Sequence, residues 1–389
     1  MLPSRWRMDR ASDARHVLTM RRWPLVLCCI SSSCVLDHPA PAHGAEDAPE
    51  GEGEDAVDGE GEGSGFEGDG DVDEPGVPDA PADPDDASGD GPDDVPDDVP
   101  DDVGDGPADD LCGEAVDIGD WSGCSLDANG DQRCVLSHGG RERAFIVHVP
   151  ENLQTPASVV LSFHGLRTTA SLQRRVSHMN DNSDAGGFVV VYTEGIGMSW
   201  NAGACCGEAT SSNLDDVGFS VAVVDWLGEH LCIARDRVFA TGLSNGGHMA
   251  YKLACDRADV FAAVASVAGV VATACAPTRP VPVLHFHGTA DSIVNYDVGI
   301  SGVGAEETVA RWGERNGCSA TSTVTFEQGD VTCRAFDGCR DNATVELCSV
   351  QGGGHQWPGG SAIPLLGANT NDVVASDRIA AFFAAHPMP

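Results

Sequence analysis

The stretch RVFATGLSNGGHMAYKLAC, residues 237–255, decides the fold of this chain. A short apolar run leads into Ser244, and a run with helical character leads out of it. Gly242 and Gly246 flank the serine, which indicates a turn too tight for larger side chains. A Gly-x-Ser-x-Gly pattern between a strand and a helix is typical of a nucleophilic serine, placed near a helix N-terminus whose dipole favours negative charge. We therefore predict that Ser244 is a nucleophile.

A serine hydroxyl needs a base, and the base needs an acid that orients it. On such a turn the acid and then the histidine follow the serine in the chain. Asp291 comes directly after a buried strand, and His355 lies in a Gly-rich loop after the last strand. Asp297 is a rival acid, but Asp291 lies nearer to the strand end, where catalytic loops emerge. We predict that Asp291 orients His355 and that His355 takes the serine proton.

Acyl transfer to a serine also needs two backbone N–H groups that bind the negatively charged oxygen of the transition state. We expect one from Asn245, the residue after the nucleophile. The other is expected from the loop SFHGLRTT, residues 162–169, which follows an earlier strand. Within this loop we assign the donor to Leu166, with His164 and Gly165 shaping the turn.

Segments with strand character and segments with helix character alternate along the chain. Largely apolar runs such as SVVLSFHG, residues 158–165, indicate strands buried on both faces. The predicted strands are residues 144–150, 158–165, 187–195, 237–242, 261–269, 281–288 and 343–350. The predicted helices are residues 215–231, 246–258, 307–317 and 375–386. This alternation predicts an α/β fold with a mostly parallel sheet and helices on both faces.

The first part of the chain has a different composition. Residues 1–44 contain a pair of arginines, a short apolar run and then small residues, as an export signal does. Residues 45–110 contain 28 acidic residues and no Lys or Arg, which predicts a disordered linker. We therefore expect a secreted protein with one folded domain, residues 111–389. Cys34, which follows three serines, leaves open a lipid anchor at the cell surface.

Twelve of the fifteen cysteines lie in the expected folded domain, an even number that predicts disulfides in an exported protein. The pairings that we consider are Cys333–Cys348, Cys318–Cys339 and, for the adjacent Cys205 and Cys206, either each other or a distant partner such as Cys232. The folded domain has a net charge of −14, which argues against nucleic acid as a partner. We expect a monomer that needs no metal and no cofactor.

Several motifs in order resemble a family of secreted esterases that comprises polyhydroxybutyrate depolymerases and feruloyl or acetylxylan esterases. The motifs are HGL, WNAGACCG, DDVGF, ATGLSNGGHMAY, HFHGTAD, VARWGERNGC and GGGHQWPGG. The resemblance runs from about His138 to the C-terminus. It implies an α/β-hydrolase domain with Ser244, Asp291 and His355 as the catalytic triad. Trp200 and Trp357 lie in two of the motif loops, and we assign them to the walls of the substrate pocket, with a core position as the alternative for Trp200.

The expected activity is hydrolysis of a carboxylic ester. We favour a feruloyl or acetylxylan type of esterase that acts on plant cell-wall polysaccharide, because no distinct substrate-binding domain follows the catalytic one. The first alternative is a polyhydroxybutyrate depolymerase, which would use the same triad. The second is a binding protein without activity, built on a hydrolase fold.

Overall fold

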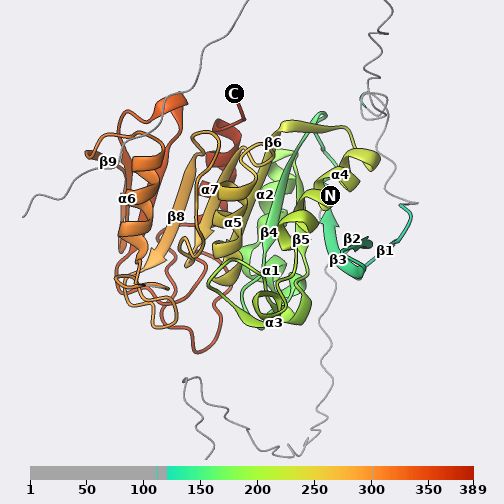
Figure 1. Cartoon of the computed structure of the whole chain (residues 1–389), viewed down its shortest axis with the longest axis horizontal. Coiled ribbons are helices and arrows are strands. Elements are labelled where there is room, and N and C mark those ends of the chain that lie inside the picture. The colour runs from blue at the N-terminus through green and yellow to red at the C-terminus, as the bar shows by residue number, and fades with distance from the viewer. Residues whose placement is uncertain (1–111, 113–120, 301) are drawn as a thin grey trace, which may run out of the picture. The chain divides into compact units, whose positions relative to one another are not determined.

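The computed structural model describes residue 112, residues 121–300 and residues 302–389. The predicted export segment and acidic linker, together with Cys34, lie outside the described residues. Within the described part the chain forms an 11-stranded sheet (Figure 1). The strand order is β1-β2-β3-β5-β4-β6-β7-β8-β11-β10-β9.

The centre of the sheet is parallel, as the sequence predicts. Strands β5, β4, β6, β7, β8 and β11 pair in parallel in that order. Their bounds are β4 Ala157–Phe163, β5 Val189–Thr193, β6 Ile233–Leu243, β7 Ala263–Val267, β8 Val283–Gly288 and β11 Val345–Val350. All residues of β5, β7 and β8 are buried, which explains the largely apolar sequences of β5 and β7; β8 also buries His285 and His287. The carboxyl ends of these strands meet at one edge of the sheet.

Antiparallel strands extend the sheet on both sides. On one side are β1 Cys124–Leu126, β2 Gln132–His138 and β3 Arg141–His148; on the other are β9 Ser322–Gln328 and β10 Val331–Phe336. Of these five strands, only β3 is predicted from the sequence. Strand β9 is largely exposed, and β2 alternates between buried and exposed residues, so neither has the apolar run of a central strand. The sheet is therefore mixed, with a parallel centre.

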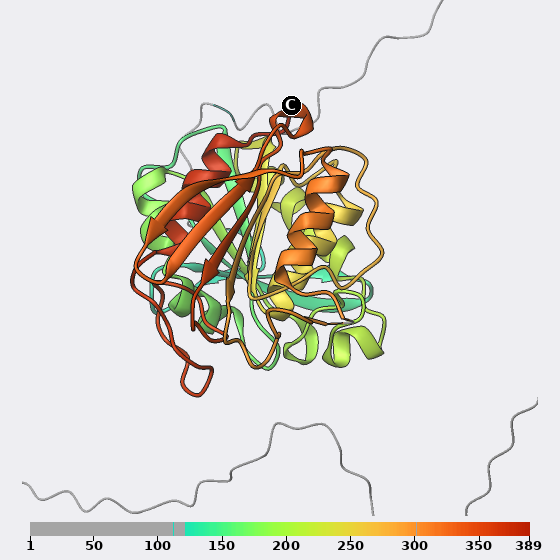
Figure 2. The ribbon, with the colours of Figure 1, turned by 90° about the vertical axis from the view of Figure 1, so that its left-hand side faces the viewer.

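Helices cover both faces of the sheet (Figure 2). Helices α4 Asp216–His230, α5 Asn245–Asp256 and α6 Ala305–Arg315 contribute to one core, whereas α1 Ala170–Ser177, α2 Met179–Gly186 and α7 Ala375–Ala385 contribute to the other. Neighbouring residues of a central strand divide between the two cores: Leu161 belongs to the first and Val160 to the second. The predicted layered α/β architecture is confirmed.

Some helical elements are absent from the prediction. These are α1, α2, the short helix α3 Gly207–Ser211, and the 3-10 turns η1 Ile196–Met198 and η2 Arg340–Asn342. Helix α2 has the sequence MNDNSDAG, whose polar residues give little amphipathic signal. At α4 the sequence offers Asp215 or Asp216 as the cap. The structure selects Asp215, whose Oδ1 accepts a hydrogen bond of 2.8 Å from the N–H of Gly218.

The twelve cysteines of this part of the chain form six disulfides. The pairs are Cys112–Cys232, Cys124–Cys134, Cys205–Cys206, Cys255–Cys275, Cys318–Cys339 and Cys333–Cys348. The predicted pairs Cys333–Cys348 and Cys318–Cys339 are confirmed, and Cys205 pairs with its neighbour. The alternative prediction that Cys205 or Cys206 pairs with Cys232 is wrong, because Cys232 is bonded to Cys112. The disulfides tie both antiparallel sides of the sheet.

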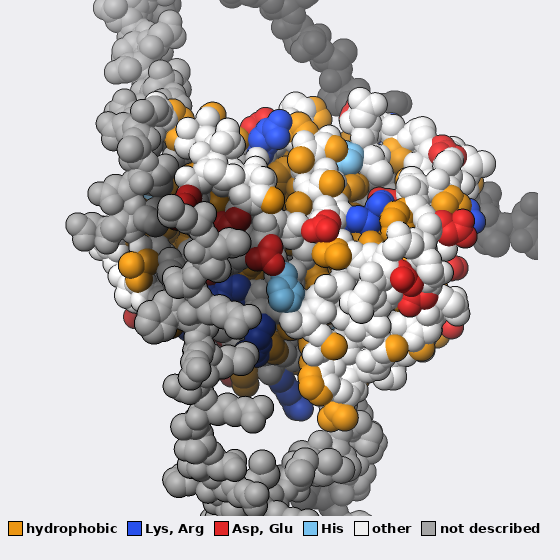
Figure 3. All heavy atoms as spheres, turned by 180° about the vertical axis from the view of Figure 1, so that it is seen from behind, with side chains coloured by type: hydrophobic (Ala, Val, Ile, Leu, Met, Phe, Trp, Pro, Cys, Tyr) orange, Lys and Arg blue, Asp and Glu red, His pale blue; other side chains and the backbone are white. Residues whose placement is uncertain are grey.

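The surface of the described residues carries side chains of every kind. On the face opposite to that of Figure 1, acidic, basic and hydrophobic side chains are interspersed (Figure 3). Within the described residues, no helix is long and apolar enough to cross a membrane.

Candidate active site

Ser244 lies on a strained turn between β6 and α5. Its backbone has φ of 58° and ψ of −118°, an unusual conformation for a residue with a side chain. A Cβ atom added to Gly246 would lie 2.1 Å from the carbonyl oxygen of Phe163, and one added to Gly242 would lie 2.5 Å from the carbonyl carbon of Gly246. Both glycines are therefore required by close backbone approach, as the motif predicts. Ser244 itself is partly exposed, so its hydroxyl is open to a substrate.

Asp291 and His355 are joined by a hydrogen bond at the same edge of the sheet. The Nδ1 atom of His355 donates to Oδ2 of Asp291 over 2.6 Å. Asp291 follows β8 and His355 follows β11, and these two strands are parallel neighbours. Because Nδ1 carries the proton, the lone pair of a neutral imidazole resides on Nε2, the nitrogen that must accept the proton of a nucleophile. In the part of the chain that the structure describes, no hydrogen bond joins this nitrogen to Ser244.

The structure discriminates between the two candidate acids. Asp291 is buried, and its Oδ1 accepts hydrogen bonds from the N–H groups of Ile293 and Val294 over 2.8 and 2.9 Å. These bonds fix the carboxylate while Oδ2 stays directed at His355. Asp297 is exposed, and its side chain makes no hydrogen bond to His355. The geometry therefore favours Asp291 as the residue that orients the histidine.

Two backbone amides near Ser244 are free to bind an oxyanion. Among the described residues, neither the N–H of Leu166 nor that of Asn245 donates a hydrogen bond, whereas the next amide of the first loop, that of Arg167, donates to Met198. The first loop lies close to the serine, because a Cβ atom added to Gly165 would be 3.5 Å from Cβ of Ser244. Both predicted donors thus lie beside the nucleophile and have no hydrogen-bond acceptor among the described residues.

The side chain of Asn245 has a separate task. Its Oδ1 accepts from the N–H of Trp200 over 2.7 Å, and its Nδ2 donates to the carbonyl of Trp200 over 3.1 Å. The loop that contains Trp200 is also held by Asp216, whose Oδ2 accepts from the N–H of Asn201 over 2.7 Å. Arg143 donates to the other oxygen of Asp216 over 2.6 Å, and both side chains are buried. This pair is not predictable from the sequence, because residues 73 positions apart give no local signal.

The two tryptophans assigned to the substrate pocket lie in the core instead. Trp200 and Trp357 both have an exposed fraction of 0%. The indole N–H of Trp200 donates to the carbonyl of His164 over 2.9 Å, and that of Trp357 donates to Oγ of Ser376 over 3.0 Å. A fully buried ring with a satisfied N–H supports the loop that carries it and offers no face to a substrate. The assignment of these residues as substrate contacts is therefore corrected.

Two buried histidines near the nucleophile are held neutral. Burial lowers the pKa of His164 and of His248 to about 4. Nε2 of His164 accepts from the N–H of Gly195 over 2.9 Å, and Nδ1 of His248 donates to the carbonyl oxygen of Val270 over 2.6 Å. Each histidine thus joins loops next to the serine, and the position predicted for His164 at the turn is confirmed.

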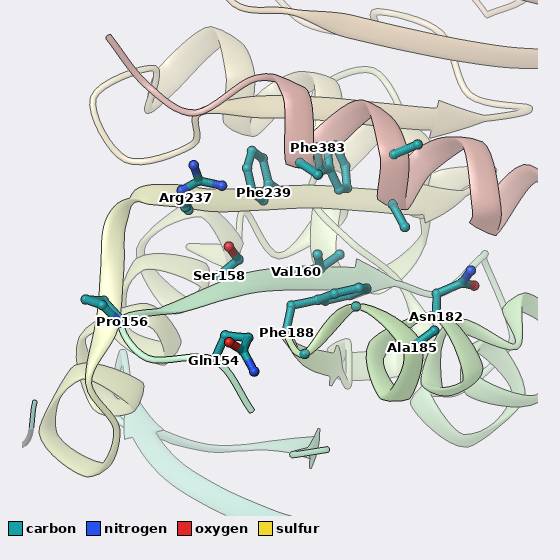
Figure 4. Close-up of a pocket in the computed structure, with 15 residues that line it drawn as sticks. Gln154, Pro156, Ser158, Val160, Asn182, Ala185, Phe188, Arg237, Phe239 and Phe383 are labelled. Carbon is teal, nitrogen blue, oxygen red and sulfur yellow. The ribbon is translucent and has the colours of Figure 1, made fainter. Parts of the chain in front are cut away.

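A cavity in the described part of the chain lies away from this edge. Its volume is about 560 Å³, and it lies between α2 and α7 over β4 and β6 (Figure 4). Phe188, Phe239 and Phe383 line it, with Arg237 toward one end. Ser158 and Val160 lie in the first half of β4, opposite to the strand end that leads to Leu166. The cavity therefore does not belong to the site around Ser244.

One cluster of residues with metal-ligand side chains lacks the thiolates that a metal would need. Among the described residues, Cys333, Glu346 and Cys348 form a cluster of metal-ligand types. The two cysteines are joined in a disulfide, so they have no thiolate to offer a metal.

A parallel sheet covered by helices on both faces, with a serine on a sharp strand-to-helix turn, is the architecture of an α/β-hydrolase. The model of the prolyl oligopeptidase family matches residues 176–277. NocK of Nocardia uniformis subsp. tsuyamanensis, assigned as an esterase, is 34% identical over 253 residues, which cover 57% of this chain and 72% of that protein. The chain belongs to the α/β-hydrolase esterase family, and the resemblance found in the sequence is confirmed.

Feruloyl esterase B of Piromyces equi is 30% identical over 234 residues, or 55% of this chain. The match spans 42% of that relative, so the chain covers less than half of its length. An acetyl xylan esterase from Aspergillus awamori superposes with a TM-score of 0.47 and 18% identity, over 62% of this chain and 94% of that one. The structural likeness is distant.

Proposed function

We propose that this protein is a secreted serine esterase that hydrolyses feruloyl or acetyl esters of plant cell-wall polysaccharides. Ser244 is the nucleophile, His355 the general base and Asp291 the residue that orients it. The observation that carries the proposal is the 2.6 Å hydrogen bond from His355 to Asp291 at the sheet edge where the turn of Ser244 emerges. The free amides of Leu166 and Asn245 complete the site.

The first half of the reaction transfers the acyl group to the enzyme. Oγ of Ser244 attacks the ester carbonyl carbon while Nε2 of His355 takes the hydroxyl proton. The carbonyl oxygen becomes negatively charged and is bound by the N–H groups of Leu166 and Asn245. The bond to the leaving alcohol then breaks, and His355 returns the proton to the alcohol oxygen. An acyl-serine and a free alcohol, here a sugar hydroxyl, are the products.

The second half repeats these steps with water. His355 takes a proton from a water molecule, whose oxygen attacks the acyl carbon of the acyl-serine. The same two amides bind the oxyanion, the bond to Oγ of Ser244 breaks, and the serine regains its proton. Asp291 stabilises the imidazolium in both halves, because its carboxylate contacts the Nδ1–H of His355. The carboxylic acid leaves, and each bond broken is balanced by one formed.

The substrate class rests on the relatives. Feruloyl esterase B is named for feruloyl esters, and a bifunctional acetylxylan esterase/xylanase of Neocallimastix patriciarum, which is 28% identical over 224 residues, is named for acetylated xylan. The proposed secretion is supported by six disulfides, which persist in oxidising compartments, and by the signal-like residues 1–44. Our proposal keeps residues 45–110 as a linker and residues 111–389 as one monomeric catalytic domain.

A hydrolysis panel tests the proposal. The full chain and its Ser244→Ala variant are compared on methyl ferulate, acetylated xylan and a hydroxybutyrate oligomer. We expect turnover of methyl ferulate or acetylated xylan by the parent chain and none by the variant. Preferred turnover of the hydroxybutyrate oligomer would contradict the substrate class and favour a polyester depolymerase. Absence of turnover on every ester, with folded protein, would contradict the esterase function itself.

A further inference from the structure

A row of buried polar side chains lies behind the candidate triad, and the mechanism above does not use it. Tyr251 on α5 and His285 and His287 on β8 are all buried, with exposed fractions of 0, 0 and 1%. The hydroxyl of Tyr251 is 2.8 Å from Nδ1 of His285. Nε2 of His285 is 2.9 Å from Nδ1 of His287. The row therefore runs from the core of α5 toward the loop after β8.

The far end of the row determines where each proton lies. Nε2 of His287 is 2.8 Å from the carbonyl oxygen of Val294, which can only accept, so Nε2 must carry the proton. Nδ1 of a neutral His287 then accepts from Nε2–H of His285, and Nδ1 of His285 accepts from the hydroxyl of Tyr251. Burial lowers the pKa of both histidines, which agrees with two neutral rings. All the hydrogen bonds of the row point toward Val294.

The Nε2–H of His287 reaches both ends of the loop that carries the acid. Besides the carbonyl of Val294, it lies 3.5 Å from Oδ2 of Asp291, the oxygen that accepts from His355. Val294 in turn donates its N–H to Oδ1 of Asp291 over 2.9 Å. His287, Val294 and the carboxylate thus form a closed ring of contacts. Removal of this N–H would loosen the loop and take one contact from Oδ2 of Asp291, while Oδ1 would keep its two backbone donors.

The other groups around His287 do not replace this donor. The ring of Tyr296 contacts it edge-on at a centroid distance of 5.7 Å, and the hydroxyl of that tyrosine bonds to Ser349 instead. His285 stacks on it at 5.2 Å and directs its own N–H at Nδ1. Among the described residues, His287 interacts electrostatically with the carboxylate of Asp291 and with the histidines His355, His285 and His248. His287 is therefore the side chain, besides His355, whose N–H faces the carboxylate of Asp291.

We propose that His287 is a positioning residue for the triad: its Nε2–H holds the loop of Asp291 so that the carboxylate stays aligned with Nδ1 of His355. The inference rests on the proposed function and adds a residue to it. His287 moves no proton and touches no substrate. It acts on the rate through the placement of Asp291, and a misplacement of about 1 Å in such a site costs roughly 100-fold in rate.

A matched pair of variants separates this role from packing. In His287→Gln the side-chain amide reaches the position of Nε2 and can still donate to Val294. In His287→Asn the amide reaches only the position of Nδ1, so the donor toward Val294 and Asp291 is lost. We expect kcat on p-nitrophenyl acetate to fall roughly 10- to 100-fold in His287→Asn, with KM nearly unchanged, and to recover most of this loss in His287→Gln. Rates are expressed per protein molecule that a fluorophosphonate labels at completion, so unfolded protein does not count.

Three results would overturn the inference: parent-like kcat in His287→Asn, equal loss in both variants, or a change in KM alone. If His287→Asn does not fold, the inference is tested by the tautomer of His287 in the parent protein, which NMR of ¹⁵N-labelled histidine measures. A proton on Nε2 of His287 agrees with the inference, and a proton on Nδ1 contradicts it. Failure of the proposed function looks different, because the parent chain itself would then neither hydrolyse esters nor react with the fluorophosphonate.

Discussion

The two ends of the central parallel strands are built differently. At the carboxyl ends, buried polar groups are densely connected: the bonds from His355 to Asp291 and from Trp200 to Asn245 are 2.6 and 2.7 Å long. Toward the amino ends of β4 and β6 lies the cavity of about 560 Å³, lined by phenylalanines. Arg237 is a basic group there, and among the described residues it has no hydrogen-bond or ion-pair partner.

The difference shows which feature marks a reacting site. The cavity offers a volume of about 560 Å³, but the residues that line it include neither a nucleophile beside a base nor a non-glycine residue with positive φ. The opposite end has Ser244 with a positive φ, an aspartate–histidine pair and two free amides. A catalytic site is expected where polar side chains converge and the backbone is strained. The volume of a cavity alone does not identify a catalytic site.

The largest effect is expected from the loss of the nucleophile. Ser244→Ala should reduce kcat roughly 10⁴- to 10⁶-fold, because no other group at the carboxyl ends can form the acyl intermediate. Thermal unfolding should be nearly unchanged, since the hydroxyl is partly exposed and makes no hydrogen bond within the described residues. Hydrolysis of p-nitrophenyl acetate and calorimetry measure the two quantities. A residual rate above one per cent of the parent would place the chemistry elsewhere.

A smaller but still large loss is expected when the acid is neutralised. Asp291→Asn should reduce kcat about 10⁴-fold, because an amide no longer stabilises the imidazolium or selects the tautomer of His355. Asp297→Asn is the matched control: it removes a nearby exposed carboxylate and should change kcat less than about twofold. Steady-state kinetics of both variants check this prediction. Equal losses in the two variants would contradict the assignment of Asp291.

The buried ion pair should matter for stability. Asp216→Ala leaves the guanidinium of Arg143 buried without its carboxylate, at a cost of about 3–5 kcal/mol in the free energy of unfolding. It also removes the acceptor of the N–H of Asn201, so kcat should fall moderately. Urea unfolding measures the first effect. Asp215→Ala is the matched control: it removes the cap of α4 and an exposed contact with His138, and should cost about 1 kcal/mol.

The buried histidines predict how stability depends on pH. In the folded protein the pKa of His164 and of His248 is about 4, whereas the ordinary value is 6.5. Between these values the unfolded chain binds protons that the folded chain does not, so stability falls as pH falls from 6.5 toward 4. Each histidine contributes a slope of about 1.4 kcal/mol per pH unit within that window. Urea titrations at pH 7, 6, 5 and 4 measure the slope, and His248→Asn should make it shallower; an unchanged slope would contradict a neutral buried His248.

The smallest effect is expected at the amino ends of the strands. Arg237→Gln should leave kcat within about twofold of the parent, because the cavity is separate from the candidate triad. Stability should change by less than about 0.5 kcal/mol, since the guanidinium has no partner among the described residues. A tenfold loss of activity would show that the two ends are coupled, and the contrast between them would fail.

The central parts of the fold could be predicted from the sequence because they obey local rules. Strands that are buried on both faces appear in the sequence as mostly apolar runs, which predicts β4 and β8. The turn of Ser244 requires glycines two residues before and after the serine, so its motif can also be recognised in the sequence. The outer strand β9 is largely exposed and lacks such a run. Its neighbour β10 was missed as well, although the hairpin disulfide Cys333–Cys348 was predicted.

The candidate site divides in the same way. The order serine, aspartate, histidine is a chain pattern, and the structure brings the last two together. The tryptophans could not be placed, because a large aromatic side chain in a motif loop suits a pocket wall and a core equally well. The contacts of Asp216 with Arg143 and of His287 with Val294 join residues from different elements, and single-residue patterns do not reveal such contacts.

The most direct test of the central claim is the location of covalent modification by a fluorophosphonate. The full chain is treated with the probe, digested, and its modified peptide sequenced by mass spectrometry. Our account predicts one adduct, on Ser244, and a labelling rate that falls at least 100-fold in His355→Ala. An adduct on another residue, or labelling of Ser244 at the same rate without His355, would contradict the proposed nucleophile and base.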